Sequence, residues 1–335
     1  MIDVWSSKSV RLPRQMIHLN NLALPIDEAV FLHTRPQDSE IQVASTSDRS
    51  TSLLAQMIRL NRILMEVNDV IAEAAECDDD TLIVVEHKIT SLSYKLHDWH
   101  CSLPGSMLDT PENLQQYAAQ GLGRIFVAVY LGYYHYGQVL LYQFLHQDQA
   151  QTGESERANK CKDFAAKLCD LVYRAHATPG CDVWYNSKSI LLDDRITNPS
   201  SPHGILTNQD HTNILLLLTV VGHILVIAST IQIHTLLFST SEIEISSARS
   251  RLEQNFQILL RLKEYWPMLE SCFARLQILH EVCRTNVDTS FRMDQWMLKF
   301  LSEFAEPVRG KGGSEGSIKE LDLVDNVGVS PQNWR

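Results

Sequence analysis

Apolar residues recur every three or four positions along most of this chain, which is the period of a helix with one buried face. One such stripe covers residues 53–71, with Asp48 and Ser50 upstream as predicted N-caps. A second covers residues 82–99, and Pro104 with the following glycine predicts its end. Strands need alternating apolar and polar positions, and such stretches are scarce here. The pattern therefore predicts a helical protein.

The same period predicts six further helices. Thr110 is the expected N-cap of a third helix that begins at Pro111 and continues through Leu140. A fourth buries the face from Cys161 to Ala175, and a long crossover then covers residues 178–209. The remaining four helices are predicted over 214–238, 248–266, 269–279 and 293–304.

These elements predict an all-α fold in which roughly eight helices form one compact domain over residues 1–305. The shorter connections favour antiparallel neighbours. Residues 306–335 turn to Gly, Ser, Lys and Asp, a composition typical of a disordered tail. The self-similarity of a helical repeat array is not found.

One apolar stretch, residues 214–238, is long enough to span a bilayer and carries no formal charge. Its polar residues Thr219, His223, Thr230 and His234 fall on one helical face. A lipid-facing helix would not concentrate them in this way, so we expect a central core helix with one polar seam and no membrane association.

Charge and cysteine content exclude further classes of protein. The 335 residues include 29 Lys and Arg against 40 Asp and Glu, a net charge of -11. Coating nucleic acid or binding anionic membrane needs clustered basic residues, so both are disfavoured. Seven cysteines form no paired framework, and the N-terminus lacks an apolar signal core. We therefore expect a reducing intracellular compartment.

No catalytic motif stands in the context that it requires. Residues 312–316 fit G-x-S-x-G, but a nucleophile elbow needs a strand before it and a helix after it, and these residues lie in the predicted tail. The pair Gly121 and Gly123 lacks the third glycine of a dinucleotide-binding turn. Asp193 and Asp194 are typical of a solvated turn. We predict that the chain is not an enzyme.

Metal ligands are most dense at His97, His100 and Cys101. His97 and Cys101 are four residues apart and could share a ligand face, but a fourth ligand is missing nearby. We therefore expect no metal and no cofactor in this chain. Three further cysteines have a spacing unlike any zinc finger or ribbon and are predicted to lie in the core: Cys161, Cys169 and Cys181.

The order of several signatures resembles the regulatory middle homology region of fungal zinc binuclear cluster transcription factors. The first is Asn21–Phe31, NLALPIDEAVF, with a Leu-Pro, an acidic pair and a Phe. Leu96–Trp99 followed by Leu103–Pro104 is similar to a helix end of the family. The aromatic helix Gly123–Leu145 and the closing helices from Val221 are also similar, and the likeness covers roughly residues 12–283.

The sequence departs from the family pattern in three ways. Tyr142–Gln143 replaces the customary Arg-Pro, and the six-cysteine cluster that binds zinc and DNA in the family is not present. The match also begins in the middle of the usual region, so the domain is expected to be N-terminally truncated. The chain therefore resembles a truncated gene model, a fragment or a regulator that has lost its DNA-binding part. Zinc is expected only if a missing N-terminal cluster exists, and no direct DNA binding is expected from this chain alone.

The resemblance implies a nuclear transcription regulator of a metabolic or secondary-metabolite gene set. It would act through co-regulators, through a DNA-binding partner protein or through a missing N-terminal DNA-binding domain. Two alternatives stay open at this point. One is a helical small-molecule-binding protein or enzyme that uses the same scaffold, with His97, His100 and the tyrosines in its pocket. The other is a nonfunctional remnant.

An effector pocket is expected among the tyrosines of the third helix, because grooves between amphipathic helices can take a small molecule. Core packing is the competing interpretation of these aromatic residues. The predicted pocket residues are Tyr130, Tyr133, Tyr134 and Tyr136.

Overall fold

Helices make up the regular structure in the part of the chain that the computed structural model describes, residues 24–33, 51–76, 82–146, 156–181, 208–265, 269–303 and 311. These residues contain no strand and ten α-helices, which confirms the all-α class. The helices are α2 (Glu28–His33), α3 (Leu53–Glu76), α4 (Leu82–Cys101), α5 (Pro111–Ala119), α6 (Gly123–Leu141), α8 (Glu156–Ala177), α11 (Asn208–Phe238), α12 (Glu242–Tyr265), α13 (Glu270–Thr285) and α14 (Gln295–Ser302).

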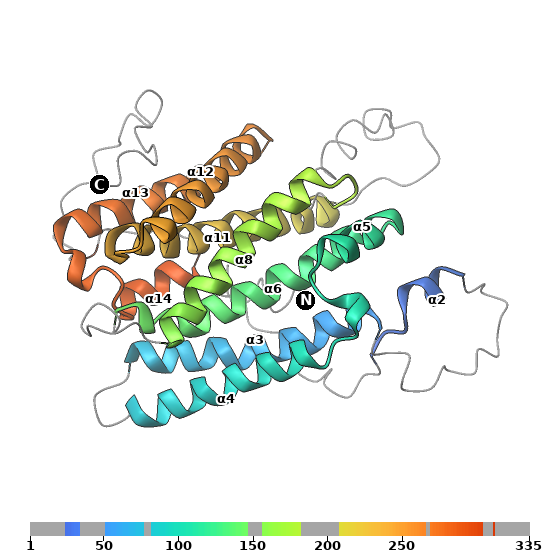
Figure 1. The fold of residues 1–335 in the computed structure, drawn as a ribbon, viewed down its shortest axis with the longest axis horizontal. Helices are drawn as coiled ribbons and strands as arrows, with labels where there is room; N and C mark the ends of the chain where they lie inside the picture. Colours follow the sequence, from blue (N-terminus) through green and yellow to red (C-terminus); the bar gives the residue numbers. More distant parts are fainter. Residues whose placement is uncertain are drawn as a thin grey trace.

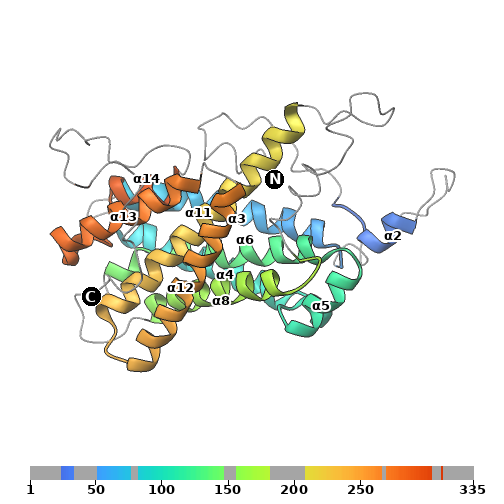
Figure 2. The same ribbon diagram turned by 90° about the horizontal axis from the view of Figure 1, so that it is seen from above.

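The long helices lie in successive layers. Figure 1 shows α4 and α3 at one side of the molecule, α6 and α8 next to them, and α11 with α12 and α13 at the other side. α5 packs on the start of α6, and α14 reaches back to α3. Seen from above in Figure 2, α11 and α12 cross the layer beneath them. α6 and α11 thus occupy the interior, each contacting several other helices.

The neighbouring helices α3 and α4 run antiparallel, as their short connection predicts. Between α3 and α4, Glu66 pairs with Lys95 and Glu73 with Lys88, so the residue numbers rise on one helix as they fall on the other. All four side chains are about half exposed, and each ion pair at such a position contributes little to the stability of the fold. The apolar stripes between the two helices supply most of the packing energy.

Helices that are not neighbours in sequence can run parallel. The Tyr142 hydroxyl, just after α6, lies 2.9 Å from the Thr230 hydroxyl on α11. A few residues further along both segments, His234 Nε2 lies 3.1 Å from the Leu145 carbonyl oxygen. Both segments therefore advance in the same direction. Connection lengths say nothing about such pairs, because another helix, α8, lies between α6 and α11 in the sequence.

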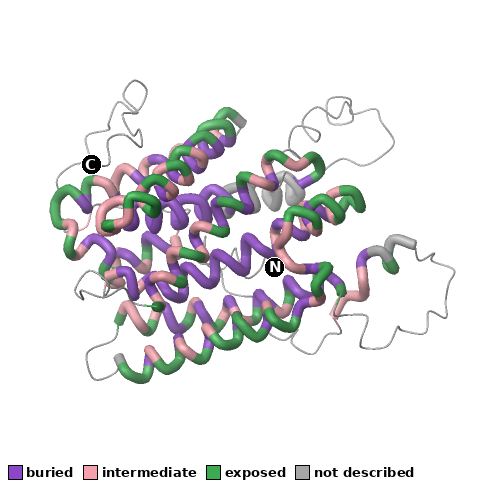
Figure 3. The backbone as a smooth tube through the Cα atoms, viewed as in Figure 1, coloured by how far each residue is buried: buried purple, intermediate pink, exposed green. Residues whose placement is uncertain are grey.

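The predicted apolar stripes form one continuous core. Figure 3 shows buried positions concentrated on the facing sides of the helices. Phe126, Leu168, Leu252 and Leu276 are fully enclosed, each from a different helix. The predicted core cysteines Cys161, Cys169 and Cys181 are also buried. The sequence period therefore placed the core faces correctly. Apolar residues at helical spacing lie on one face of the helix, and that face is removed from water by packing against other helices.

Sequence reasoning missed the short helix α2 and its effect on the start of α3. The buried Glu28 carboxylate accepts hydrogen bonds from the Leu53 and Leu54 backbone amides, at 3.1 and 2.8 Å, and from the Ser52 hydroxyl. Ser52 is the N-cap, since its hydroxyl accepts from the Ala55 amide at 3.0 Å. An acid at this position favours the helix dipole. The predicted caps at residues 48 and 50 lie outside the described residues.

The predicted third helix is wrong in its length, because it is divided into α5 and α6. Thr110 caps α5 as predicted, accepting from the Asn113 amide. Gly121 then adopts a left-handed conformation with a φ of 74°. The Leu122 amide donates to the Tyr117 carbonyl and the Gly121 amide to the Ala118 carbonyl, which is a Schellman motif. The left-handed residue ends one helix and redirects the next.

The apolar stretch of α11 lies in the protein core where its side chains are described. Val221–Phe238 has the length and composition of a membrane span, yet 83% of this segment is buried inside the protein. Its polar seam is internal too, since His223, Thr230 and His234 are all buried. The prediction of a core helix with one polar seam is confirmed for these residues. The Thr219 side chain lies outside the described residues.

The far end of the chain is described only in part. α14 begins after Asp294, whose carboxylate caps it by accepting from the Met297 amide at 2.9 Å. Lys311, a residue of the predicted tail, lies 2.8 Å from the same carboxylate and donates to the Thr289 carbonyl. The rest of residues 306–335 lies outside the described residues, as do most of the predicted crossover and Phe304.

Replacing Gly123 with alanine is expected to lower the free energy of unfolding by about 1–2 kcal/mol. An added Cβ would lie 2.6 Å from Cys181 Sγ and 3.0 Å from both the Ala118 Cα and the Gly180 carbonyl oxygen. Two of these three neighbours are backbone, so the α5–α6 junction must shift. Chemical denaturation measures the change. Gly105→Ala is the matched control and should be close to neutral, because its Cβ would meet nothing within 4 Å.

Candidate functional site

The four predicted pocket tyrosines lie on α6 and are all buried. Tyr130, Tyr133 and Tyr134 share one face, since residues three and four apart are neighbours on a helix. Their rings contact one another at centroid distances of 5.3 to 6.3 Å. Tyr136 faces α3, where its hydroxyl donates to Asn61 Oδ1 at 2.7 Å. Sequence reasoning therefore grouped three of the four on a common surface.

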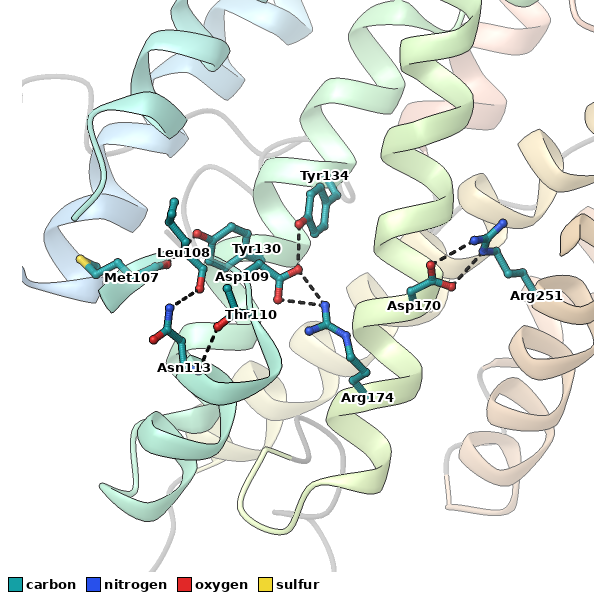
Figure 4. Close-up of polar contacts among 10 residues, drawn as sticks. All are labelled: Met107, Leu108, Asp109, Thr110, Asn113, Tyr130, Tyr134, Asp170, Arg174 and Arg251. Carbon is teal, nitrogen blue, oxygen red and sulfur yellow. Dashed lines mark hydrogen bonds and ion pairs between the residues drawn. The ribbon is translucent and has the colours of Figure 1, made fainter. Parts of the chain in front are cut away.

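Two more of these hydroxyls donate to the α4–α5 connection. The Tyr130 hydroxyl donates to the Met107 carbonyl at 2.6 Å, and that of Tyr134 donates to Asp109 Oδ2 at 2.7 Å (Figure 4). Desolvation raises the pKa of both phenols far above the ordinary value of 10, and the Asp109 charge adds to the rise. These phenols therefore stay protonated and act as donors.

Asp109 is the centre of the polar network in Figure 4. Arg174 Nη2, from α8, lies 2.9 and 2.8 Å from the two carboxylate oxygens, one of which also accepts from Tyr134. The Asp109 side chain is only 6% exposed and that of Arg174 is 30% exposed. The network joins the α4–α5 connection to α6 and α8 at one point. Because the two charged residues are 65 positions apart in sequence, no local pattern could indicate the pair.

Tyr133 makes the closest ring contact with His100 of α4, and Tyr130 meets the same imidazole edge-on at 6.4 Å. His100 stacks on the Tyr133 ring with centroids 5.0 Å apart and an interplanar angle of 13°. Trp99 lies against the same ring at 5.2 Å, and Phe164 of α8 meets it edge-on at 5.5 Å. Burial lowers the pKa of His100, and the charges of Lys167 and His97 lower it further. The imidazole is therefore neutral at neutral pH and packs as an aromatic ring.

The predicted ligand pair His97 and Cys101 is brought together at the exposed side of α4. Nε2 of His97 lies 3.4 Å from Sγ of Cys101. Both side chains are exposed, and Cys101 is the exposed free cysteine of the described residues. No group of three or more metal-binding side chains gathers anywhere in the described ranges.

The buried histidines of α11 bind carbonyl groups. His223 Nε2 lies 2.9 Å from the Leu301 carbonyl oxygen at the end of α14, and His234 contacts the Leu145 carbonyl. Sequence reasoning missed His135 of α6, which is buried. The centroid of its ring lies 6.4 Å from that of His223, and its Nδ1 lies 3.3 Å from Gln138 Nε2. His135 lies within a run of aromatic residues, so its position gave no periodic signal in the sequence.

Acid is expected to weaken folding through His135. Burial lowers its pKa from 6.5 to about 3. The unfolded chain therefore takes up a proton below pH 6.5 that the folded protein refuses, so the stability is full above pH 6.5 and falls as the pH drops toward 3. Between pH 7 and 5 this residue alone should cost about 2 kcal/mol.

Urea denaturation of the wild type and His135→Gln at both pH values measures this effect. The wild type should lose more free energy of unfolding than the variant does over the same interval. Equal losses would show that His135 does not sense the pH.

The glycine pair of the sequence does not form a nucleotide site. Gly121 and Gly123 form the α5–α6 junction rather than a phosphate-binding turn. Residues 193–194 and 312–316 lie outside the described residues.

Comparison with known proteins identifies no relative, because no protein-family model, no curated protein and no solved structure matches this chain. The geometry therefore has to carry the functional argument. It places a closed aromatic and polar network inside the bundle, with His97, His100 and Cys101 at its α4 edge.

Proposed function

We propose that this protein is a regulator of transcription that works as a helical interaction body and not as a DNA-binding unit or an enzyme. The support from sequence is the ordered likeness to the regulatory region of fungal zinc binuclear cluster factors. The observation that carries the proposal is that polar side chains inside the bundle bind one another and so link its helices. Asp109, Arg174 and Tyr134 bind one another, so this charge pair ties helices together and is not held ready for a substrate.

The net charge of the chain indicates how such a regulator would reach a promoter. The chain has a net charge of -11, so its mean field repels the phosphate backbone of DNA. Contact with a promoter would come through a DNA-binding partner or through a DNA-binding domain of the same factor. Co-regulators are then the natural ligands of the helical surface, since amphipathic helices dock in grooves between helices. Such a protein works in the nucleus, on a metabolic or secondary-metabolite gene set.

A tethering experiment tests this function. The full chain is fused to a heterologous DNA-binding domain, and transcription is measured from a reporter that carries its binding sites. We expect a change in reporter output relative to the DNA-binding domain alone, in either direction. Asp109→Ala in the same fusion should reduce the change, because it loosens the bundle. Unchanged output, with the fusion shown to be folded and nuclear, would contradict the proposal.

Direct DNA binding is tested separately. The untagged full chain should leave the mobility of a mixed DNA fragment pool unchanged at physiological salt. A retarded, salt-sensitive band would contradict a partner-dependent mode and would point to a basic surface on the chain.

The second candidate is a small-molecule-binding protein or enzyme on the same scaffold. It is favoured by one observation, the stack of His100 on Tyr133 beside His97 and Cys101. Native mass spectrometry of the purified chain discriminates the two. A bound organic molecule that is lost in Tyr133→Ala, together with an inactive tethered fusion, would favour this alternative. The chain mass alone, with an active fusion, would favour the regulator.

A further inference from the structure

The pair His97 and Cys101 has the spacing of two ligands on one metal ion. Zinc forms bonds of about 2.3 Å to a thiolate and about 2.0 Å to an imidazole nitrogen, at tetrahedral angles. Those bonds place the sulfur and the nitrogen about 3.5 Å apart. In this protein Nε2 of His97 and Sγ of Cys101 are 3.4 Å apart with no ion between them. The same sulfur lies 4.0 Å from Nδ1, so it sits beside the ring and off the axis of the Nε2 lone pair. An ion can bind both atoms once the exposed imidazole rotates to aim Nε2 at it, while the spacing of the two residues on the helix stays unchanged.

The helix holds the two ligands in place. His97 and Cys101 occupy successive turns of α4, whose buried face is fixed by Leu96 and Trp99. Residues four apart on a helix lie one above the other, so the pair keeps its spacing as long as α4 is folded. Pre-placed ligands lower the entropy cost of chelation.

The surroundings suit a cation. Cys101 is the last residue of α4, where the dipole of a helix is negative. The nearby ammonium of Lys167 is neutralised in part by Asp163, 2.8 Å away on α8. Both ligands are exposed, so an ion can reach them and keep two coordination positions for water or for a ligand from another molecule.

We propose that His97 Nε2 and Cys101 Sγ form a binding site for a divalent cation of the zinc type, with two protein ligands and two open positions. Imidazole and thiolate together select zinc and cobalt over magnesium and calcium, which prefer oxygen. Binding converts the Cys101 thiol to a metal-bound thiolate and releases one proton for each ion bound. This site is distinct from the six-cysteine cluster of the resembled family and independent of the proposed regulatory function.

Cobalt is the probe that reports the ligands directly. The untagged, reduced, metal-free full chain is titrated with Co²⁺, and the thiolate-to-cobalt charge-transfer absorption is followed together with proton release. We expect one band that saturates at one equivalent of bound cobalt, with displacement by Zn²⁺. His97→Ala should weaken binding at least about tenfold, and Cys101→Ser should abolish the thiolate band.

Control variants separate this site from the other thiols. Cys77→Ser should keep the band, and so should His87→Ala, which changes a histidine ten residues before His97 on the same helix. Circular dichroism confirms that each variant is folded, which is expected because the His97 and Cys101 side chains are exposed. No band at millimolar cobalt in the wild type, or a band unchanged in both His97→Ala and Cys101→Ser, would overturn the proposal.

A protection assay gives a second readout. Zn²⁺ should slow alkylation of Cys101 in the native protein, and His97→Ala should remove this protection. Mg²⁺ at the same concentration should have no effect. Equal alkylation rates with and without Zn²⁺ would show that the thiol and imidazole form only a hydrogen-bonded pair.

Discussion

Replacing Asp109 with alanine should lower the free energy of unfolding by about 3 kcal/mol. The carboxylate is 6% exposed, accepts from Tyr134 and pairs with Arg174, so its removal leaves a phenol without its acceptor and a guanidinium without its counterion. The α4–α5 connection would also lose its attachment to α8. Equilibrium urea denaturation measures the loss, and Asp109→Asn should cost less because an amide oxygen still accepts.

Figure 4 shows the matched control for this change. Asp170 on α8 pairs with Nε and Nη2 of Arg251 through two contacts of 2.9 and 3.1 Å, which are of similar length but at an exposed site. Asp170 is 49% exposed, so water replaces the lost partner and Asp170→Ala should cost less than about 1 kcal/mol. If the two alanine variants lose equal stability, burial of Asp109 is not the cause of its effect.

Replacing Arg275 with alanine should have an effect of similar size, about 3 kcal/mol, and should release α14 first. The Arg275 side chain is 2% exposed, and its guanidinium donates to the Glu303, Phe300 and Lys299 carbonyl oxygens at the end of α14. Burial lowers the pKa of Arg275 to about 10, so the guanidinium stays charged at neutral pH. Its positive charge interacts favourably with the negative C-terminal end of α14.

Hydrogen exchange locates the consequence of losing Arg275. The amides of Gln295–Ser302 should exchange faster in Arg275→Ala, while those of α3 change less. Arg275→Lys keeps the charge but cannot bridge three carbonyl groups, so its loss should be intermediate. Arg284→Ala removes a 67% exposed arginine from the same helix and should be almost neutral. Uniform faster exchange across the bundle would contradict a local role for Arg275.

The sequence predicted which residues of the candidate site lie together, but not which other side chains they contact. A helical wheel places Tyr130, Tyr133 and Tyr134 on one face, and a spacing of four puts His97 beside Cys101. Neither rule says what those side chains meet. Only the packing of α4 and α8 against α6 put His100 on the Tyr133 ring and gave the Tyr134 hydroxyl a carboxylate.

Local helix boundaries show the same limit on a smaller scale. Thr110 was identifiable as a cap because its partner is three residues away. Glu28 was not, because the amides that it binds are 25 and 26 residues further along the chain. The break at Gly121 had a local signal, a glycine at a position that needs a left-handed backbone, which the apolar period overrode in the prediction.

The sequence by itself determined the helical class, the buried faces and the caps whose partners lie within one turn. These depend on interactions between residues three or four apart, which the order of amino acids states directly. Only the tertiary structure decided which helices meet, that α6 and α11 run parallel, and that Asp109 and Arg275 are closed off from water. Those outcomes depend on contacts between residues far apart in the chain, where shape and desolvation, and not spacing, select the partner.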